Sequence, residues 1–148
     1  KAIRRQRQMC IRDRPEFTET GTYSAGVIYA YENDTHCQKL CFEQDEYGDH
    51  RVVSVRTLGT SDDNNHQAIT APYVYMRLSS DGTTLGSYFS EDGKIWRMAR
   101  LYKNDFPEKL LIGISSQSPK DNEHTCLFTE VSLTDKPVAD FRKGNIAE

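Results

Sequence analysis

The chain has 148 residues, the size of one domain, and its formal net charge of −3 argues against a dedicated nucleic-acid binder, because such proteins carry a strongly basic face. No apolar run approaches the roughly 18 residues of a membrane-spanning helix. Aromatic and β-branched residues are spread along the chain, which excludes global disorder. We expect one folded domain with no nucleic-acid and no membrane partner.

The first fourteen residues, Lys1 to Arg14, differ from the rest of the chain. They read KAIRRQRQMCIRDR, a basic block without strand or helix periodicity and without the apolar centre of a signal peptide. The string RQRQMCIRDR resembles translated adapter read-through at the ends of assembled sequencing contigs. We therefore expect residues 1–14 to be a non-native or disordered arm, residues 15–148 to form the single domain, and the natural N-terminus to be missing. The alternative is a natural basic arm that binds nucleic acid.

From Tyr23 onward, short segments of alternating apolar and polar residues recur between turn-rich connectors such as 59–65. Asp92-Gly93 separates the clearest pair of such segments. This dipeptide predicts a hairpin, because glycine accepts the positive φ of a tight hairpin turn. The predicted strands are Gly26–Tyr31, Cys37–Glu43, Val52–Thr57, Tyr73–Ser79, Leu85–Ser90, Ile95–Leu101, Leu110–Ser116 and Thr125–Leu133. Many short strands without helices predict two antiparallel sheets packed as a sandwich, or a barrel.

Alternation within these strands predicts two faces. The apolar face should lie between the sheets and consists of Leu40, Phe42, Val53, Val55, Val74, Met76, Leu78, Leu85, Phe89, Leu110, Ile112 and Ile114. The other face gathers charged and aromatic residues, and its candidate ligand-binding residues are Lys39, Glu43, Arg56, Tyr75, Arg77, Tyr88 and Ser90. The alternative is that they form only the polar outer surface that antiparallel sheets normally have. Trp96, which opens the strand after the hairpin, is predicted to plug the core.

Other reactive side chains show no specific pattern. Cys37, Cys41 and Cys126 fit no zinc motif, and we expect reduced thiols in a cytoplasmic protein. The acidic and amide residues of 62–65 could hold calcium but are also typical of turns. The sequence contains no nucleophile elbow, phosphate loop or dinucleotide fingerprint. We therefore expect no cofactor, no metal and no catalytic residue.

Between about Tyr23 and Leu133 the chain carries, in this order, Ala25-Gly26, Lys39 with Glu43, Arg77, Ser90-x-Asp92-Gly93-x-x-Trp96, Gly113, Ser118-Pro119 and Phe128. This ordered set resembles the concanavalin A-like family called "regulation of enolase protein". It implies a jelly-roll β-sandwich with a curved sheet, whose concave side binds sugars in relatives of the wider fold. Family members begin well before Tyr23, so it also implies one or two missing opening strands and an unpaired sheet edge.

Two departures from that family bear on sugar binding. Cys37 and Asp63 stand where the family tends to place tryptophan. Sugars commonly stack on aromatic rings, so these losses weaken a sugar-binding platform unless Tyr29, Tyr31 or another tyrosine replaces it.

Glycoside hydrolysis requires two carboxylates about 5 to 9 Å apart. Glu43 and Asp45 share a strand face at roughly 7 Å, but Asp45 lies at the entry of a turn. Gly48 also stands where enzymes of the resembled fold often carry a second glutamate.

The sequence thus predicts an all-β, concanavalin A-like jelly-roll sandwich that binds a carbohydrate or an anionic small molecule without catalysis. Lys39 and Arg77 would bind anionic or hydroxyl oxygens, Glu43 would accept sugar hydroxyls and Tyr88 would supply a flat apolar wall. These four should line one shallow trough, with Ser90 adding a hydroxyl contact. Two alternatives remain open: a protein-interaction or regulatory module that acts through a sheet edge or loop, and a degenerate glycoside hydrolase.

Overall fold

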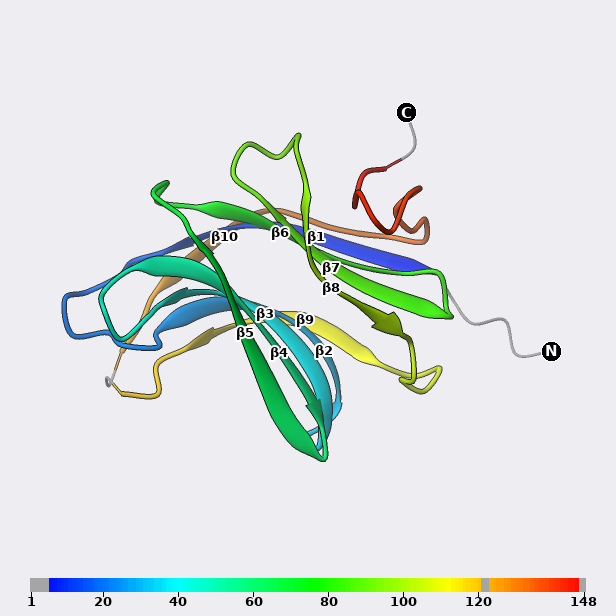
Figure 1. The fold of residues 1–148 in the computed structure, drawn as a ribbon, viewed down its shortest axis with the longest axis horizontal. Helices are drawn as coiled ribbons and strands as arrows, with labels where there is room; N and C mark the ends of the chain where they lie inside the picture. Colours follow the sequence, from blue (N-terminus) through cyan, green and yellow to red (C-terminus); the bar gives the residue numbers. More distant parts are fainter. Residues whose placement is uncertain (1–5, 121–122, 147–148) are drawn as a thin grey trace.

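The computed structural model describes residues 6–120 and 123–146, which contain ten strands and no helix. Two five-stranded antiparallel sheets pack as a sandwich (Figure 1). We call them sheet A, with the order β10-β1-β6-β7-β8, and sheet B, with the order β5-β4-β3-β2-β9. The strands are β1 (Arg7–Pro15), β2 (Ala25–Asn33), β3 (His36–Gln44), β4 (His50–Leu58), β5 (Thr60–Ala68), β6 (Val74–Ser80), β7 (Thr84–Ser90), β8 (Arg97–Lys103), β9 (Leu111–Gln117) and β10 (Cys126–Thr134). The prediction of an all-β sandwich is confirmed.

Strand β5 forms where the sequence predicts a connector. It lies at the edge of sheet B and pairs only with β4 among the described strands. Nearly all of its side chains are exposed, so it carries no apolar alternation that a sequence pattern could detect. Gly59, with a φ of 74°, makes the tight turn that reverses the chain into β5.

Strand β1 differs from the expectation that residues 1–14 lie outside the domain. Residues 7–14 belong to a strand in sheet A that pairs with β6 on one side and with β10 on the other. Met9 and Ile11 point into the core, so this part of the block is structurally integrated. Residues 1–5 lie outside the described residues.

Polar side chains at buried positions hide β1 from sequence analysis. Gln8 is 6% exposed and Asp13 is fully buried, so the apolar alternation typical of a strand is interrupted. Neither carboxylate oxygen of Asp13 has a hydrogen-bond partner among the described residues. Its side chain lies against Gly26 of β2, where an added Cβ would lie only 1.9 Å from Oδ2. Burial without a partner raises the pKa of Asp13 to about 8.

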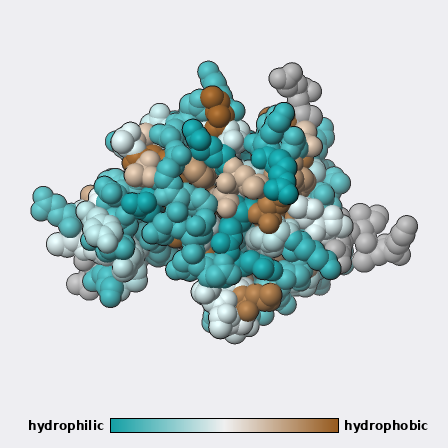
Figure 2. All heavy atoms as spheres, viewed as in Figure 1, coloured by the Kyte–Doolittle hydropathy of each residue, from teal (hydrophilic) through white to brown (hydrophobic). Residues whose placement is uncertain are grey.

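The main core lies between the sheets and includes Phe42 from sheet B and Met76 and Phe89 from sheet A. Most of the predicted apolar face is confirmed. The prediction is wrong for Val53 and Val55, because the neighbouring Ser54 pairs with core-facing Leu40 and therefore shares its face. The surface seen in Figure 2 is mainly hydrophilic, with separate hydrophobic patches.

Sheet B is curved, and its hollow side faces away from sheet A (Figure 1). A second apolar cluster lies on this concave side of the sheet and consists of Ala25, Val27, Cys41, Val53 and Val55, with Tyr29 packed against it; the five clustered side chains are buried. The described residues contain no helix capable of crossing a membrane.

Candidate functional site

The structure separates the seven predicted ligand-binding residues onto different surfaces. Lys39 and Glu43 lie on β3, on the hollow side of sheet B. Arg56 of β4 lies over the ring of Tyr102 and pairs with Asp105 at 3.0 Å. The other four lie in sheet A on the side opposite the core, and they are Tyr75, Arg77, Tyr88 and Ser90.

The expectation that Lys39, Glu43, Arg77 and Tyr88 line one trough is therefore wrong. Alternation along a strand assigns a side chain to the inner or the outer side of its own sheet. It does not identify the sheet, and the outer sides of the two sheets of a sandwich point in opposite directions. Lys39 and Glu43 in sheet B accordingly lie on the opposite side of the domain from Arg77 and Tyr88 in sheet A.

Three hydrogen-bonded polar side chains span the concave side of sheet B above the second apolar cluster. The Nζ atom of Lys39 donates to Oε1 of Gln117 at 3.0 Å, and Nε2 of Gln117 donates to Oε2 of Glu43 at 3.3 Å. Gln117 of β9 and Glu43 of β3 both pair with Ala25 of the intervening β2. The short side chain of Ala25 leaves room for the two longer ones to meet above it.

Gln117 is a site residue that sequence analysis missed. It lies one residue beyond the predicted strand Leu110–Ser116, and that position gives no sign that its side chain reaches β3, because two strand registers decide the contact. Tyr29 lies directly opposite Lys39 in the β2–β3 pair and brings an aromatic ring to the same surface. The hollow thus combines an ammonium, an amide, a carboxyl and a ring.

The environment of Glu43 brings its titration close to neutral pH. Desolvation raises the pKa of its carboxyl to about 7, although the positive charge of Lys39 works in the opposite direction. At neutral pH the group is therefore present in both forms. The protonated form can donate a hydrogen bond to a ligand hydroxyl, and the ionised form can accept one.

Asp45 follows the end of β3, two residues after Glu43, but it is buried and its oxygens are already occupied. They accept hydrogen bonds from the N–H groups of Tyr47 and Asp49 at 2.9 Å and from Nε of Arg51 at 2.6 Å. Burial opposes ionisation of Asp45, yet these bonds outweigh it and lower the pKa of Asp45. The carboxylate therefore stabilises the β3–β4 turn, and the geometry does not favour Asp45 as a catalytic partner.

On the outer side of sheet A, Arg77 and Tyr88 are buried beneath residues 138–146, which we call the C-terminal turn. Ser90 Oγ donates to Asp92 and accepts from the N–H of Gly93, so it stabilises the hairpin turn. Trp96 is not part of the core cluster, and the prediction that it plugs the core is wrong. It lies under Arg77, whose guanidinium carbon is 3.7 Å from the centroid of the indole ring.

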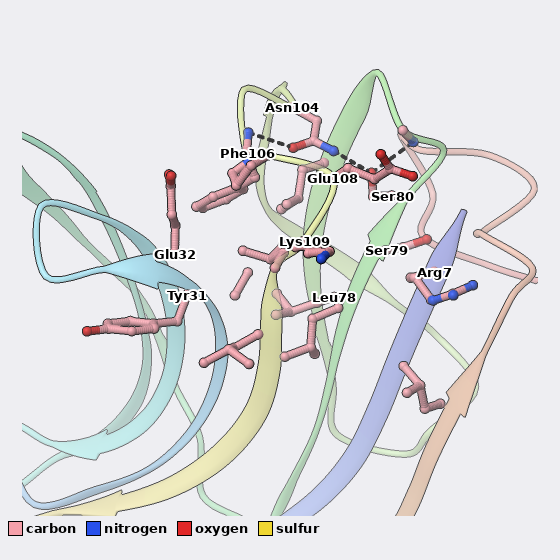
Figure 3. A pocket seen from close by; sticks show the side chains of 18 residues that line it. Arg7, Tyr31, Glu32, Leu78, Ser79, Ser80, Asn104, Phe106, Glu108 and Lys109 are labelled. Atoms are coloured by element: carbon pink, nitrogen blue, oxygen red, sulfur yellow. Dashed lines mark hydrogen bonds between the residues drawn. The ribbon is translucent and has the colours of Figure 1, made fainter. Parts of the chain in front are cut away.

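A cavity of about 810 Å³ opens at one end of the sandwich (Figure 3). Its lining includes the apolar side chains of Leu78 and Leu85 and the charged residues Glu32, Glu108 and Lys109. The side-chain amide of Asn104 donates to Ser80 Oγ, and its oxygen accepts from the N–H of Phe106, which holds the loop after β8. Among the described residues, no group of three or more histidines, cysteines or carboxylates is placed to hold a metal ion.

Comparison with known families gives a match over residues 5–136, to the family described as "Protein of unknown function (DUF1349)". The chain belongs to this family. The DUF1349 match begins before β1 and ends before the C-terminal turn. No curated protein matches the chain.

Solved structures share the fold of this DUF1349 chain. A functionally unknown protein from Saccharomyces cerevisiae aligns with a TM-score of 0.79 and 24% identity, over 88% of this chain and 69% of that one. The GH43 BlXynB protein from Bacillus licheniformis aligns with a TM-score of 0.73 and 12% identity, over 88% of this chain and 28% of that one. A xylan beta-1,4-xylosidase from Bacillus halodurans aligns with a TM-score of 0.68 and 14% identity, over 83% of this chain and 26% of that one.

These likenesses confirm the jelly-roll β-sandwich and, at such identities, the fold alone. This chain spans only about a quarter of the length of the two Bacillus proteins. In those proteins the similar sandwich therefore accounts for part of a longer chain.

Proposed function

We propose that this DUF1349 chain is a non-catalytic module that binds a carbohydrate or a similar small polar ligand in the hollow of sheet B. The observation that carries the proposal is the hydrogen-bonded bridge from Lys39 through Gln117 to Glu43, which lies above a buried apolar cluster. Alternating donors and acceptors beside a ring suit a molecule with hydroxyl groups on one side and C–H groups on the other. The sandwich shared with a xylosidase supports the carbohydrate class by analogy.

Replacing Lys39 by Ala is expected to weaken binding of the best ligand from a glycan array by about tenfold or more, because a charge-assisted hydrogen bond is lost. Affinity would be measured by calorimetry, and binding would be confirmed by a thermal shift. Lys94→Ala, at an exposed position between β7 and β8, is the matched control and should bind as the unmodified chain does. Equal affinity of both variants would contradict the proposed site.

Affinity is also expected to depend on pH near 7, through Glu43. The ionised carboxylate is the stronger acceptor of sugar hydroxyls, so affinity should rise between about pH 6 and pH 8, around a pKa of about 7. Glu43→Gln should remove this dependence. Calorimetry at the two pH values measures the effect. Hydrolysis of aryl glycosides that disappears in Glu43→Gln would instead favour the degenerate glycoside hydrolase.

A protein-interaction module is the second candidate, and the edge strands favour it. β9 and β10 are edge strands among the described residues and expose apolar side chains; Leu111 is 69% exposed and Leu133 is 63% exposed. Both leucines also line the cavity in Figure 3. A partner strand that pairs with β9 or β10 could therefore insert an apolar side chain into this cavity. The resemblance to the "regulation of enolase protein" family would fit this candidate.

A pull-down from a host lysate should then return one stoichiometric partner. Leu111→Lys should lose that partner, because a charge would enter an apolar contact. Leu58→Lys, at a similarly exposed leucine of β4, should retain it as the control. A cytoplasmic location remains part of the proposal and is consistent with the free thiols of Cys10, Cys37, Cys41 and Cys126.

A further inference from the structure

The outer side of sheet A contains a buried cation whose partners are all uncharged. Arg77 is only 6% exposed, and no carboxylate pairs with it among the described residues. Its Nε donates to Sγ of Cys10, and its Nη1 donates to the carbonyl oxygen of Gly144. Because desolvating a guanidinium is costly, such groups usually face a carboxylate or a phosphate. A thiol and one carbonyl are weak substitutes.

The C-terminal turn supplies that carbonyl and is a compact unit. The N–H of Ala139 donates to the carbonyl of Asn145 at 2.8 Å, and the N–H of Gly144 donates to the carbonyl of Asp140 at 2.7 Å. These bonds close the turn on itself.

Three hydrogen bonds between described residues dock the C-terminal turn on the sheet. Besides the contact with Arg77, the N–H of Val138 donates to Ser79 Oγ at 2.9 Å, and the hydroxyl of Tyr88 donates to the carbonyl of Phe141 at 2.7 Å. Gly144 packs against the ring of Tyr88, where an added Cβ would lie 2.3 Å from Cδ1. Docking therefore depends on a glycine at this position.

The C-terminal turn lies outside the part of the chain that matches the family. The match ends at residue 136, whereas Arg77, Tyr88 and Trp96 are all within it. In Figure 1 the red C-terminal segment lies on the side of sheet A that faces away from sheet B. The segment that covers Arg77 therefore lies outside the family match, whereas Arg77 and the indole ring beneath it lie inside.

We propose that Arg77 and Trp96 form a binding site for a small carboxylate-bearing ligand of about the size of a sugar acid, and that the C-terminal turn covers this site. The carbonyl oxygen of Gly144 occupies the position that a ligand carboxylate oxygen would take. An arginine fork matches a carboxylate in geometry and charge, and the indole stacked on it keeps the fork in place. Undocking of the turn exposes the fork together with the ring of Tyr88.

Trp96 makes this proposal directly measurable, since it is the only tryptophan in the chain and contacts Arg77. Titration of the full chain with glucuronate should change the tryptophan fluorescence, whereas glucose, its neutral counterpart, should not. Arg77→Gln should abolish the response. A response to glucose of equal strength, or an unchanged response in Arg77→Gln, would overturn the proposal.

Gly144→Val tests the role of the C-terminal turn while leaving Arg77 and Trp96 themselves unchanged, because the added side chain would clash with the ring of Tyr88 and displace the turn. Because the turn competes with the ligand, its displacement should tighten glucuronate binding by about tenfold. Gly48→Val is the matched control: it has the same left-handed backbone, with a φ of 83°, but an added Cβ would meet no atom within 4 Å. Its affinity should remain that of the unmodified chain.

A second variant keeps the test decisive if Gly144→Val fails to fold. Tyr88→Phe retains the ring but removes the hydrogen bond to Phe141, so it should also tighten binding, by a smaller factor. Unchanged affinity in both variants, or no fluorescence response to glucuronate in any folded variant, would contradict the proposal. Lys39→Ala should leave this response intact, which separates the site from the one proposed in sheet B.

Discussion

Replacing Asp13 by Asn is expected to stabilise the domain above about pH 5 and to leave its stability nearly unchanged near pH 3. The carboxyl is fully buried and has no hydrogen-bond partner within residues 6–120 and 123–146, and its pKa in the folded state is raised from 3.8 to about 8. Between these pH values the folded state retains a proton that the unfolded state has lost. Rising pH therefore favours unfolding throughout this window.

The size of the effect follows from the same pKa values. The free energy of unfolding of the unmodified chain should fall by about 1.4 kcal/mol for each pH unit between 3.8 and about 8. At pH 9 the Asp13→Asn variant should therefore be more stable by on the order of 5 kcal/mol. Urea unfolding of both proteins at several pH values measures it, and the difference between the two curves isolates Asp13 from other titrating groups, such as Glu43. Parallel curves for the two proteins would contradict the burial of this carboxyl.

A double substitution provides the structural control for β1. Gly26→Ala alone should destabilise the chain, because the new methyl group would overlap the carboxylate of Asp13. The same change should cost much less in an Asp13→Ala background, where the overlapping atoms are absent. Additive effects of the two substitutions would show that β1 does not lie against β2.

Replacing Phe42 by Ala is expected to destabilise the domain by about 3–5 kcal/mol. This ring is fully buried between the sheets and meets the ring of Phe17 edge-on, with 5.3 Å between their centroids. Its removal loses the transfer free energy and leaves a cavity that rigid sheets fill only in part. Such a loss is a large share of the stability of a single domain.

Tyr47→Ala is the matched control for that prediction, because its ring is 83% exposed in the connection between β3 and β4. Its effect should remain within about 0.5 kcal/mol. Chemical unfolding monitored by circular dichroism compares the two variants. A similar loss in both would mean that Phe42 does not belong to the core.

The prediction of the strands succeeded where their pattern is local. Alternation of apolar and polar residues in β3, β6 and β7 reflects burial of one side of each strand. The predicted turn at Asp92-Gly93 is also local, because the carboxylate of Asp92 accepts hydrogen bonds from the N–H groups of Lys94 and Ile95. The prediction failed for the two strands that form without regular alternation of apolar and polar residues. β5 is an exposed edge strand, and β1 places Gln8 and Asp13 at buried positions.

The candidate site was predicted only in part, for a geometric reason. Lys39 and Glu43 lie four residues apart in one strand, so alternation alone places them on one side of a sheet. Gln117 joins them only because β9 and β3 flank β2 in a particular register. Arg77 and Tyr88 share the outward direction but belong to the other sheet.

The sequence by itself therefore determined the fold class, most strands and the inner or outer side of many residues, because these depend on neighbours within a few positions. Only the tertiary structure decided which outward residues meet, since that depends on strand order, on register and on the segment that covers each sheet. The C-terminal turn over Arg77 illustrates this point, because 67 residues separate Gly144 from the guanidinium that it contacts.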